Sequence, residues 1–222
     1  AESRIQTAMK NPTKTFRVNF IGTLNVLKAC KQYKIDRILY SSTSSYYGLK
    51  NDVPLVEDMD RDCLNPYSSS KVAGEDLVKM YSKLYNIRSV VFRYFNVYGE
   101  RQPTKGQYAP VVGLFQKMKS EGKPMTVVGN GLARRDYTHV KDVVNANILA
   151  SVKKELSGSN VINIGTGMNY SVLELVDLIG GKYVYIPPRE GEAKETLADI
   201  SAAKKYLNWE PTICLEDWIK NK

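Results

Sequence analysis

Short apolar runs that resemble buried β-strands alternate with longer amphipathic segments over the first hundred residues of the chain. The strand-like runs occupy residues 37–41 and 89–95, and the second is too apolar to alternate between two faces. Helical periodicity of apolar residues covers residues 18–30 and 67–84. Strands that are separated by helices pair in parallel through right-handed crossovers. The order therefore predicts an α/β fold with a doubly wound parallel sheet.

The same kinds of segment continue after residue 100 in a less regular order. Strands are predicted at residues 125–128, 160–164 and 183–186, and helices near 110–120 and at 142–152, 172–179, 201–207 and 215–220.

The net charge of +9 is spread over the 222 residues rather than concentrated in one basic segment. Scattered lysines on predicted helix faces are typical of a solvated surface, and a protein that binds an anionic small molecule has the same composition. No apolar run approaches the 18 residues of a membrane span. We therefore expect no nucleic acid and no membrane among the partners.

Histidine and cysteine are scarce. The single histidine is His139, and the three cysteines lie far apart in the sequence. We expect no metal site, a structural role for His139, no disulfide framework and a reducing, cytoplasmic environment.

The sharpest chemical feature is a Tyr-x-x-x-Lys motif formed by Tyr67 and Lys71 at the start of a predicted helix. The spacing places the phenol and the ammonium on one helix face. A tyrosine with a pKa near 10 is a poor base at neutral pH, and a neighbouring ammonium lowers that pKa. The motif alone is weak, because a surface tyrosine beside a solvated lysine gives the same pattern.

Two flanking segments strengthen the interpretation. The strand before the motif ends in Ser41-Ser42-Thr43-Ser44-Ser45-Tyr46-Tyr47-Gly48, and the strand after it ends in Arg93-Tyr94-Phe95-Asn96-Val97-Tyr98-Gly99. Doubly wound folds bind ligands at the carboxyl edge of the sheet. Three consecutive elements thus deliver polar groups to one edge.

These segments, in this order, resemble the extended short-chain dehydrogenases/reductases that act on nucleotide sugars, with UDP-galactose and UDP-N-acetylglucosamine 4-epimerases as the nearest type. The resemblance includes Arg134-Arg135-Asp136-Tyr137-Thr138-His139-Val140 and Pro188-Arg189-Glu190-Gly191-Glu192, and it runs over nearly the whole chain. It implies that residues 1–100 form the later part of a Rossmann-like NAD-binding domain, interleaved with later segments. Residues 101–222 would form mainly a smaller α/β domain that binds the nucleotide sugar.

The resemblance also implies roles for the motif residues. Tyr67 would take the proton from the sugar 4-hydroxyl, and Thr43 would bond to the same oxygen. Lys71 would hold the nicotinamide ribose and lower the pKa of Tyr67. NAD would accept and return the hydride, so that the reaction has no net oxidation. The cofactor side would comprise Ser41, Tyr67, Lys71, Tyr94 and Phe95.

On the substrate side, the resemblance assigns Arg135 and Arg189 to the pyrophosphate, for which the forked guanidinium is suited. From the residues alone, a local salt-bridge cluster at Arg134-Arg135-Asp136 is an equally good interpretation. The resemblance assigns five further residues to the substrate: Asn96 near the diphosphate, Val127 at the base, Glu192 at the ribose, Thr196 at the sugar, and Tyr137 together with Arg135.

Ser44 and Ser45 occupy the positions where related dehydratases and decarboxylases carry acidic residues, which favours simple epimerisation. Thr196 aligns with a position that is bulky in enzymes restricted to plain hexoses. A small side chain there would leave room for an N-acetyl group. The alternatives are another epimerase, dehydratase or decarboxylase of the same family.

A glycine-rich dinucleotide motif is absent from the chain, and Gly165-Thr166-Gly167 lacks the third glycine and the following acidic residue. Residues Ala1-Glu2-Ser3 resemble the segment just after the fourth strand of the family. We therefore expect an incomplete doubly wound sheet without the part that binds the NAD pyrophosphate. A nucleotide-sugar-binding module without turnover is the alternative of a different class.

The family dimerises through helices that correspond to residues 16–33 and 67–84, so the resemblance implies a homodimer. Leu24, Leu27, Val72 and Met80 could serve either the core or this interface.

Overall fold

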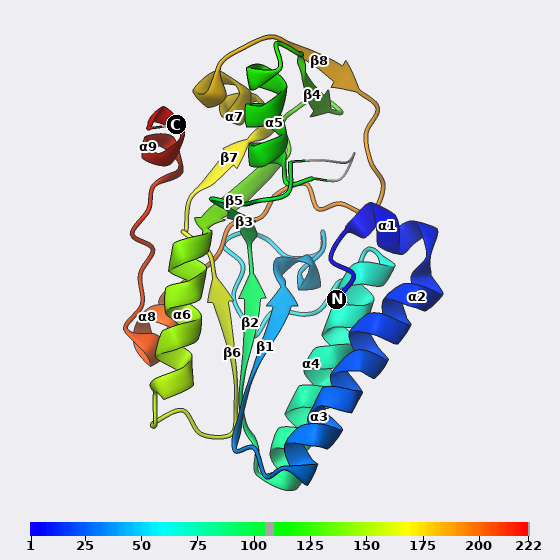
Figure 1. Cartoon of the computed structure of the whole chain (residues 1–222), viewed down its shortest axis with the longest axis vertical. Helices are drawn as coiled ribbons and strands as arrows, with labels where there is room; N and C mark the ends of the chain where they lie inside the picture. The colour runs from blue at the N-terminus through cyan, green and yellow to red at the C-terminus, as the bar shows by residue number, and fades with distance from the viewer. Residues whose placement is uncertain (105–108, 222) are drawn as a thin grey trace.

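Three parallel strands form the sheet that carries the predicted motifs (Figure 1). The computed structural model describes residues 1–104 and 109–221. In it β1 (Arg37–Thr43), β2 (Arg88–Tyr94) and β6 (Ser159–Ile164) are ordered β1-β2-β6. Thr43 is in register with Tyr94, and Tyr94 with Ile164. The three strands therefore end level with one another at the carboxyl edge.

Helices cover both faces of this sheet (Figure 1). On one side lie α3 (Gly22–Gln32) and α4 (Pro66–Tyr85), preceded by α1 (Ile5–Lys10), α2 (Pro12–Phe16) and a π-helical turn η1 (Arg17–Ile21). On the other lie α6 (Val140–Val152) and α8 (Ser201–Leu207). Val91 packs with the α3–α4 side, whereas Val90 and Phe92 pack with α6 and α8. A strand buried on both faces is apolar on both of them, and the middle of β2 is apolar at each successive position from Val90 to Phe92.

The remaining elements form a second layered unit in the upper part of Figure 1. The strands β4 (Met125–Val128) and β8 (Tyr183–Ile186) pair in parallel, and β5 (Arg134–His139) lies between β3 (Asn96–Tyr98) and β7 (Asn169–Ser171). The helices α5 (Val111–Ser120), α7 (Val172–Ile179) and α9 (Leu215–Lys220) pack on these strands around a core that includes Phe115, Met125 and Leu175.

The α/β class with a parallel sheet is confirmed, and several predicted elements match the observed bounds. The pattern did not predict β3, β5 and β7. The strands β3 and β7 have only three residues each, and β5 carries the polar sequence Arg-Arg-Asp-Tyr-Thr-His, so hydropathy gives no strand signal. The segment 18–30 is not one α-helix either, because a π-helical turn precedes α3.

The first sheet takes its third strand, β6, from the second half of the chain. The division near residue 100 stays a prediction. Among the described residues, no helix combines the length and the apolar character that crossing a membrane requires.

Candidate active site

The carboxyl edge of β1 turns directly into a short 3₁₀ helix, η2 (Ser44–Tyr46). Thr43 has extended backbone angles, and its hydroxyl accepts a hydrogen bond from the Ser45 amide at 3.1 Å. This cap ends the strand and holds the Thr43 side chain at the sheet edge.

The N-terminus of α4 is fixed by a reciprocal cap. The Asn65 side chain accepts a bond from the Ser68 amide at 2.8 Å, and the Ser68 hydroxyl accepts one from the Asn65 amide at 3.3 Å. Pro66 occupies the first helical position, where its missing N–H costs nothing. Tyr67 therefore lies in a rigid first turn at the same edge as Thr43.

The Tyr67 phenol and the Thr43 side chain line the same cavity and interact there. Burial raises the pKa of Tyr67, and the Thr43 side chain opposes that rise. The expectation that Lys71 lowers the pKa of Tyr67 is not met in this structure, because desolvation of the phenol outweighs the other effects.

Lys71 is buried one helical turn after Tyr67. Its Nζ lies 4.3 Å from the centre of the Tyr40 ring, and among the described residues it has no hydrogen-bond acceptor. Burial lowers the pKa of Lys71 to about 8, and the nearby Glu75 carboxylate opposes the shift. The donor capacity of this ammonium is therefore unused.

Beneath the site, the Glu75 carboxylate accepts two hydrogen bonds from Arg93 and one from the Ser42 hydroxyl. These three residues come from α4, β2 and β1. The network joins the elements that carry Tyr67, Tyr94 and Thr43. Sequence reasoning did not assign it, although Glu75 follows Lys71 by four residues.

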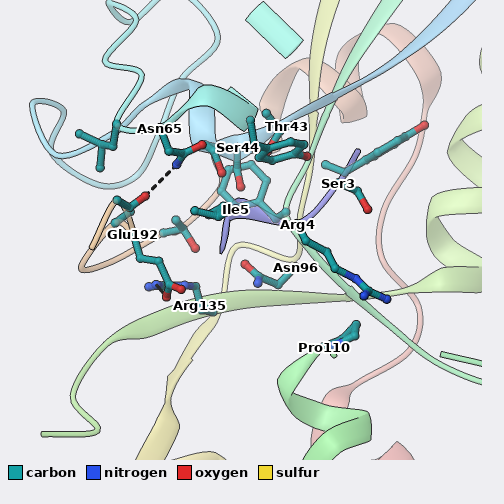
Figure 2. A pocket seen from close by; sticks show the side chains of 18 of the residues that line it. Ser3, Arg4, Ile5, Thr43, Ser44, Asn65, Asn96, Pro110, Arg135 and Glu192 are labelled. Carbon is teal, nitrogen blue, oxygen red and sulfur yellow. Dashed lines mark hydrogen bonds and ion pairs between the residues drawn. The ribbon is translucent and has the colours of Figure 1, made fainter. Parts of the chain in front are cut away.

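A cavity of about 560 Å³ opens at this edge, between the two units of the fold (Figure 2). Nine of the predicted site residues line it: Thr43, Tyr67, Tyr94, Phe95, Asn96, Arg135, Arg189, Glu192 and Thr196. Four do not line it: Ser41, Lys71, Val127 and Tyr137. In Figure 2, Thr43 and Ser44 lie on one side of the cavity, and Arg135 and Glu192 lie on the other.

The four residues outside the lining have other surroundings. Ser41 is exposed on β1, and the neighbouring Tyr94 phenol donates a hydrogen bond to Asn147 Oδ1 at 3.0 Å. Val127 and Tyr137 are buried in the core of the second unit, and the Tyr137 hydroxyl has no partner among the described residues. Burial raises the pKa of Tyr137 strongly.

Two arginines approach Glu192 inside the cavity. Arg135 Nη2 lies 3.8 Å from Glu192 Oε2, and Arg189 Nη1 lies 3.9 Å from Glu192 Oε1. Arg135 also donates to the carbonyls of Arg134 and Lys194, at 2.9 and 3.2 Å. The arrangement presents two forked donors to one space.

The local salt-bridge interpretation of residues 134–136 is wrong, because the three side chains have different partners. Arg134 pairs with Glu174 at 3.0 Å. Asp136 is fully buried and accepts bonds from the amides of Thr166, Gly167 and Ala198, at 2.8, 3.0 and 3.2 Å.

The loop Gly165-Thr166-Gly167 thus wraps the Asp136 carboxylate. This contact explains why the loop contains glycines, and a bound dinucleotide is not needed to explain them. A Cβ at Gly165 would overlap the Cβ of Ala198 and lie 2.8 Å from Asp136 Oδ2. His139 lies outside the cavity, where its Nδ1 accepts the Lys141 amide at the start of α6.

Sequence reasoning missed one segment of the site. Ser3, Arg4, Ile5 and Gln6 line the cavity beside the loop that carries Arg189. The only signal was the resemblance of Ala1-Glu2-Ser3 to the segment just after the fourth strand of the family, and hydropathy does not report a contact of this kind.

Comparison with known proteins gives one consistent result. The family model described as GDP-mannose 4,6 dehydratase matches residues 1–222. The UDP-glucose 4-epimerase of Thermotoga maritima, solved with UDP-glucose, is 33% identical with a TM-score of 0.94, over 99% of this chain and 72% of that chain. The UDP-N-acetylglucosamine 4-epimerase of Methanobrevibacter ruminantium, in complex with UDP-N-acetylmuramic acid, is 28% identical with a TM-score of 0.92, over 99% and 72%.

The UDP-glucuronic acid 4-epimerase of Bacillus cereus, in complex with UDP-glucuronic acid and NAD, is 34% identical with a TM-score of 0.83, over 91% of this chain and 65% of that chain. These relatives share one fold and one reaction class. The chain therefore belongs to the NAD-dependent epimerase/dehydratase family of nucleotide-sugar enzymes and is UDP-glucose 4-epimerase-like.

Proposed function

We propose that the protein catalyses the NAD-dependent 4-epimerisation of a UDP-hexose or UDP-N-acetylhexosamine through a transient 4-keto sugar. The observation that carries the proposal is the placement of Thr43 and Tyr67 together at the wall of a cavity that Arg135 and Arg189 also line. A base and a hydroxyl on one side suit the sugar, and the arginines suit the diphosphate.

In this reaction Tyr67 removes the proton from the sugar 4-hydroxyl and later returns it. The Thr43 hydroxyl bonds to the phenol and to the same sugar oxygen, and it stabilises the deprotonated phenol. Between the two half-reactions the 4-keto sugar rotates in the cavity and presents its opposite face. The hydride then returns to that face, so the configuration at C4 is inverted.

The residues beside Tyr67 fit the nicotinamide end of NAD. Lys71 is a buried cation with unused donors, which suits the hydroxyls of a ribose. Ser41, Tyr94 and Phe95 would complete this side of the site. When bound, the cofactor supplies reversible hydride transfer at the sugar C4.

On the substrate side, Arg135 and Arg189 hold the diphosphate, and Asn96 lies next to it. Glu192 accepts bonds from the nucleotide ribose hydroxyls, a role compatible with its half-buried position between the two arginines. Backbone groups of the Val127 strand would read the base, and Tyr137 would support Arg135 from within the core.

Ser44 and Ser45 favour epimerisation over elimination or decarboxylation. Both residues lie in η2 and line the cavity next to Thr43. Loss of water or carbon dioxide needs a further acid or base at the sugar, and a serine hydroxyl does not ionise at neutral pH.

The test is interconversion of UDP-glucose and UDP-galactose by the purified protein with NAD. Tyr67→Phe should lower kcat by about 10²- to 10⁴-fold, the usual contribution of a general base. Tyr33→Phe is the matched control, because Tyr33 is exposed on the far end of α3 and should leave kcat unchanged. Binding of UDP-sugars without turnover would instead identify a binding module.

Acceptance of an N-acetylated sugar is tested by substituting Thr196, which is buried and lines the cavity. Thr196→Tyr fills space at the sugar, so turnover of UDP-N-acetylglucosamine should be lost while that of UDP-galactose is kept. Equal loss of both activities would contradict an acetyl-accepting pocket.

We also propose a homodimer formed through α3 and α4. Val26, Met80 and Leu84 are exposed apolar residues of these helices, whereas Leu27 and Val72 are buried in the core. Met80→Glu combined with Leu84→Glu should yield a monomer in sedimentation velocity. Val152→Glu, on the exposed side of α6, should leave the dimer intact.

A further inference from the structure

Arg4 is a cation at the cavity that none of the roles above uses. It precedes α1 in an extended backbone conformation, and its side chain lines the cavity. In Figure 2 the side chain points away from Thr43 and toward Pro110, the residue that precedes α5. It therefore extends toward the part of the cavity that lies away from the Thr43–Tyr67 pair.

The backbone on the N-terminal side of Arg4 is held by a buried clamp. The Asn19 side chain accepts a bond from the Glu2 amide at 2.7 Å and donates to the Glu2 carbonyl at 2.9 Å. It also donates to the Ser70 hydroxyl at 2.9 Å, and Ser70 lies between Tyr67 and Lys71 on α4. The clamp ties the Arg4 segment to the helix of the proposed base.

The backbone on the other side is tied to the second unit of the fold. The Gln6 side chain donates to the carbonyl of Glu190 at 3.2 Å, next to Arg189. Arg4 is thus anchored between α4 and the loop that supplies one of the two arginines. Such anchoring lowers the entropy that the backbone segment carrying Arg4 loses when a ligand binds.

The charges of the cavity indicate what Arg4 binds. Among the described lining residues, the ionisable groups charged at neutral pH are Arg4, Arg135, Arg189 and Glu192, a net charge of +2. Arg135 and Arg189 lie within 4 Å of Glu192, while Arg4 has no ion-pair partner in the described part of the chain. A diphosphate diester carries two negative charges, so all three arginines are needed to balance it beside Glu192.

We propose that Arg4 is a third cationic ligand of the substrate diphosphate and that the cavity is charge-matched to a nucleoside diphosphate joined to an uncharged sugar. This inference rests on the proposed function, since it assumes a nucleotide sugar in the cavity. A sugar carboxylate would add a negative charge for which the described lining residues offer no further cation.

Calorimetric titration with uridine, UDP, UDP-glucose and UDP-glucuronate tests the role of Arg4. Arg4→Gln should weaken binding of UDP and UDP-glucose by about tenfold, as expected for one charge-assisted contact, and leave uridine unaffected. Arg4→Lys should restore part of the loss. Lys14→Gln on α2 removes the same charge outside the cavity lining and should change none of the affinities.

The outcomes separate the two proposals. A protein that binds neither UDP nor UDP-glucose refutes the proposed function and this inference with it. Normal binding that Arg4→Gln leaves unchanged refutes only the role of Arg4. Equal weakening of uridine shows a structural effect and also overturns it. Tighter binding of UDP-glucuronate than of UDP-glucose, lost in Arg4→Gln, would assign Arg4 to a sugar carboxylate instead.

Discussion

Glu75 and Arg93 form a buried ion pair with two hydrogen bonds, from Nε to Oε1 at 3.2 Å and from Nη2 to Oε2 at 3.0 Å. Both side chains are 1% exposed. A buried ion pair contributes little more to stability than an apolar contact of the same size. Removing one partner is destabilising, however, because it leaves the other charge buried without a counter-charge. Because Ser42 donates to the same carboxylate, the pair also fixes the strand end that carries Thr43.

Glu75→Gln should therefore destabilise the protein by about 3–5 kcal/mol, since it leaves the Arg93 guanidinium buried without its counter-charge. The free energy of unfolding from urea titration measures this cost. Asp76→Asn is the neighbouring control, because the Asp76–Arg61 pair is exposed and should contribute less than about 1 kcal/mol. Similar losses in the two variants would show that the buried pair has no special role.

The lowered pKa of Lys71 makes the stability of the protein depend on pH. Its pKa is about 8 in the folded protein and about 10.5 when unfolded, so the unfolded state binds more protons between these values. The group thus destabilises the fold at neutral pH by about 3 kcal/mol, and the penalty fades as the pH rises toward 10.

Lys71→Met removes this penalty together with the ammonium. Relative to the unaltered protein, the variant should be more stable at pH 7, and the difference should shrink by about 2 kcal/mol by pH 10. Urea titrations of both proteins at the two pH values measure it. A difference that does not vary with pH would mean that Lys71 keeps its ordinary pKa.

Thr43 predicts a shift in the pH profile of the proposed epimerisation. The Thr43 side chain opposes the rise in the pKa of Tyr67, so Thr43→Ala should raise that pKa further. The acid limb of kcat/KM should then move to higher pH. Thr43→Ser keeps the hydroxyl and should retain the original limb, and an identical profile for Thr43→Ala would exclude the coupling.

Gly165 predicts a steric effect at the Asp136 loop. Gly165→Ala places a methyl group against Ala198 and the Asp136 carboxylate, so it should cost about 1–3 kcal/mol of stability. Gly22→Ala is the control, because a Cβ there meets nothing within 4 Å and alanine is the better helix former. That variant should be neutral or more stable by up to about 1 kcal/mol in thermal denaturation.

The sequence predicts the elements whose stability comes from apolar burial. The strand at residues 125–128 and the helices at 172–179 and 201–207 have the predicted bounds, because their hydrophobic periodicity and their packing coincide. The strand at residues 134–139 could not be predicted in this way. It is held by a buried carboxylate that binds backbone amides far along the chain, and no local pattern encodes those partners.

The residues of the candidate site also divide into those that sequence motifs predict and those that depend on contacts across the fold. Residues in sequence motifs, such as Tyr67 and Arg135, line one cavity, as their common edge suggests. Arg4 and the Glu75–Arg93 pair escaped prediction because their importance depends on contacts across the fold. The pKa of Tyr67 also depends on desolvation, which the spacing of Tyr67 and Lys71 does not report.

The place of β6 in the sheet affects how the protein can fold during its synthesis. The strand pairs with β2, yet about seventy residues separate the partners Ser89 and Ser159 along the chain. Until residue 164 has left the ribosome, β2 has an open edge and its apolar residues on the α6 side are uncovered. The nascent chain therefore has a long interval in which a chaperone can bind that edge before the native strand arrives.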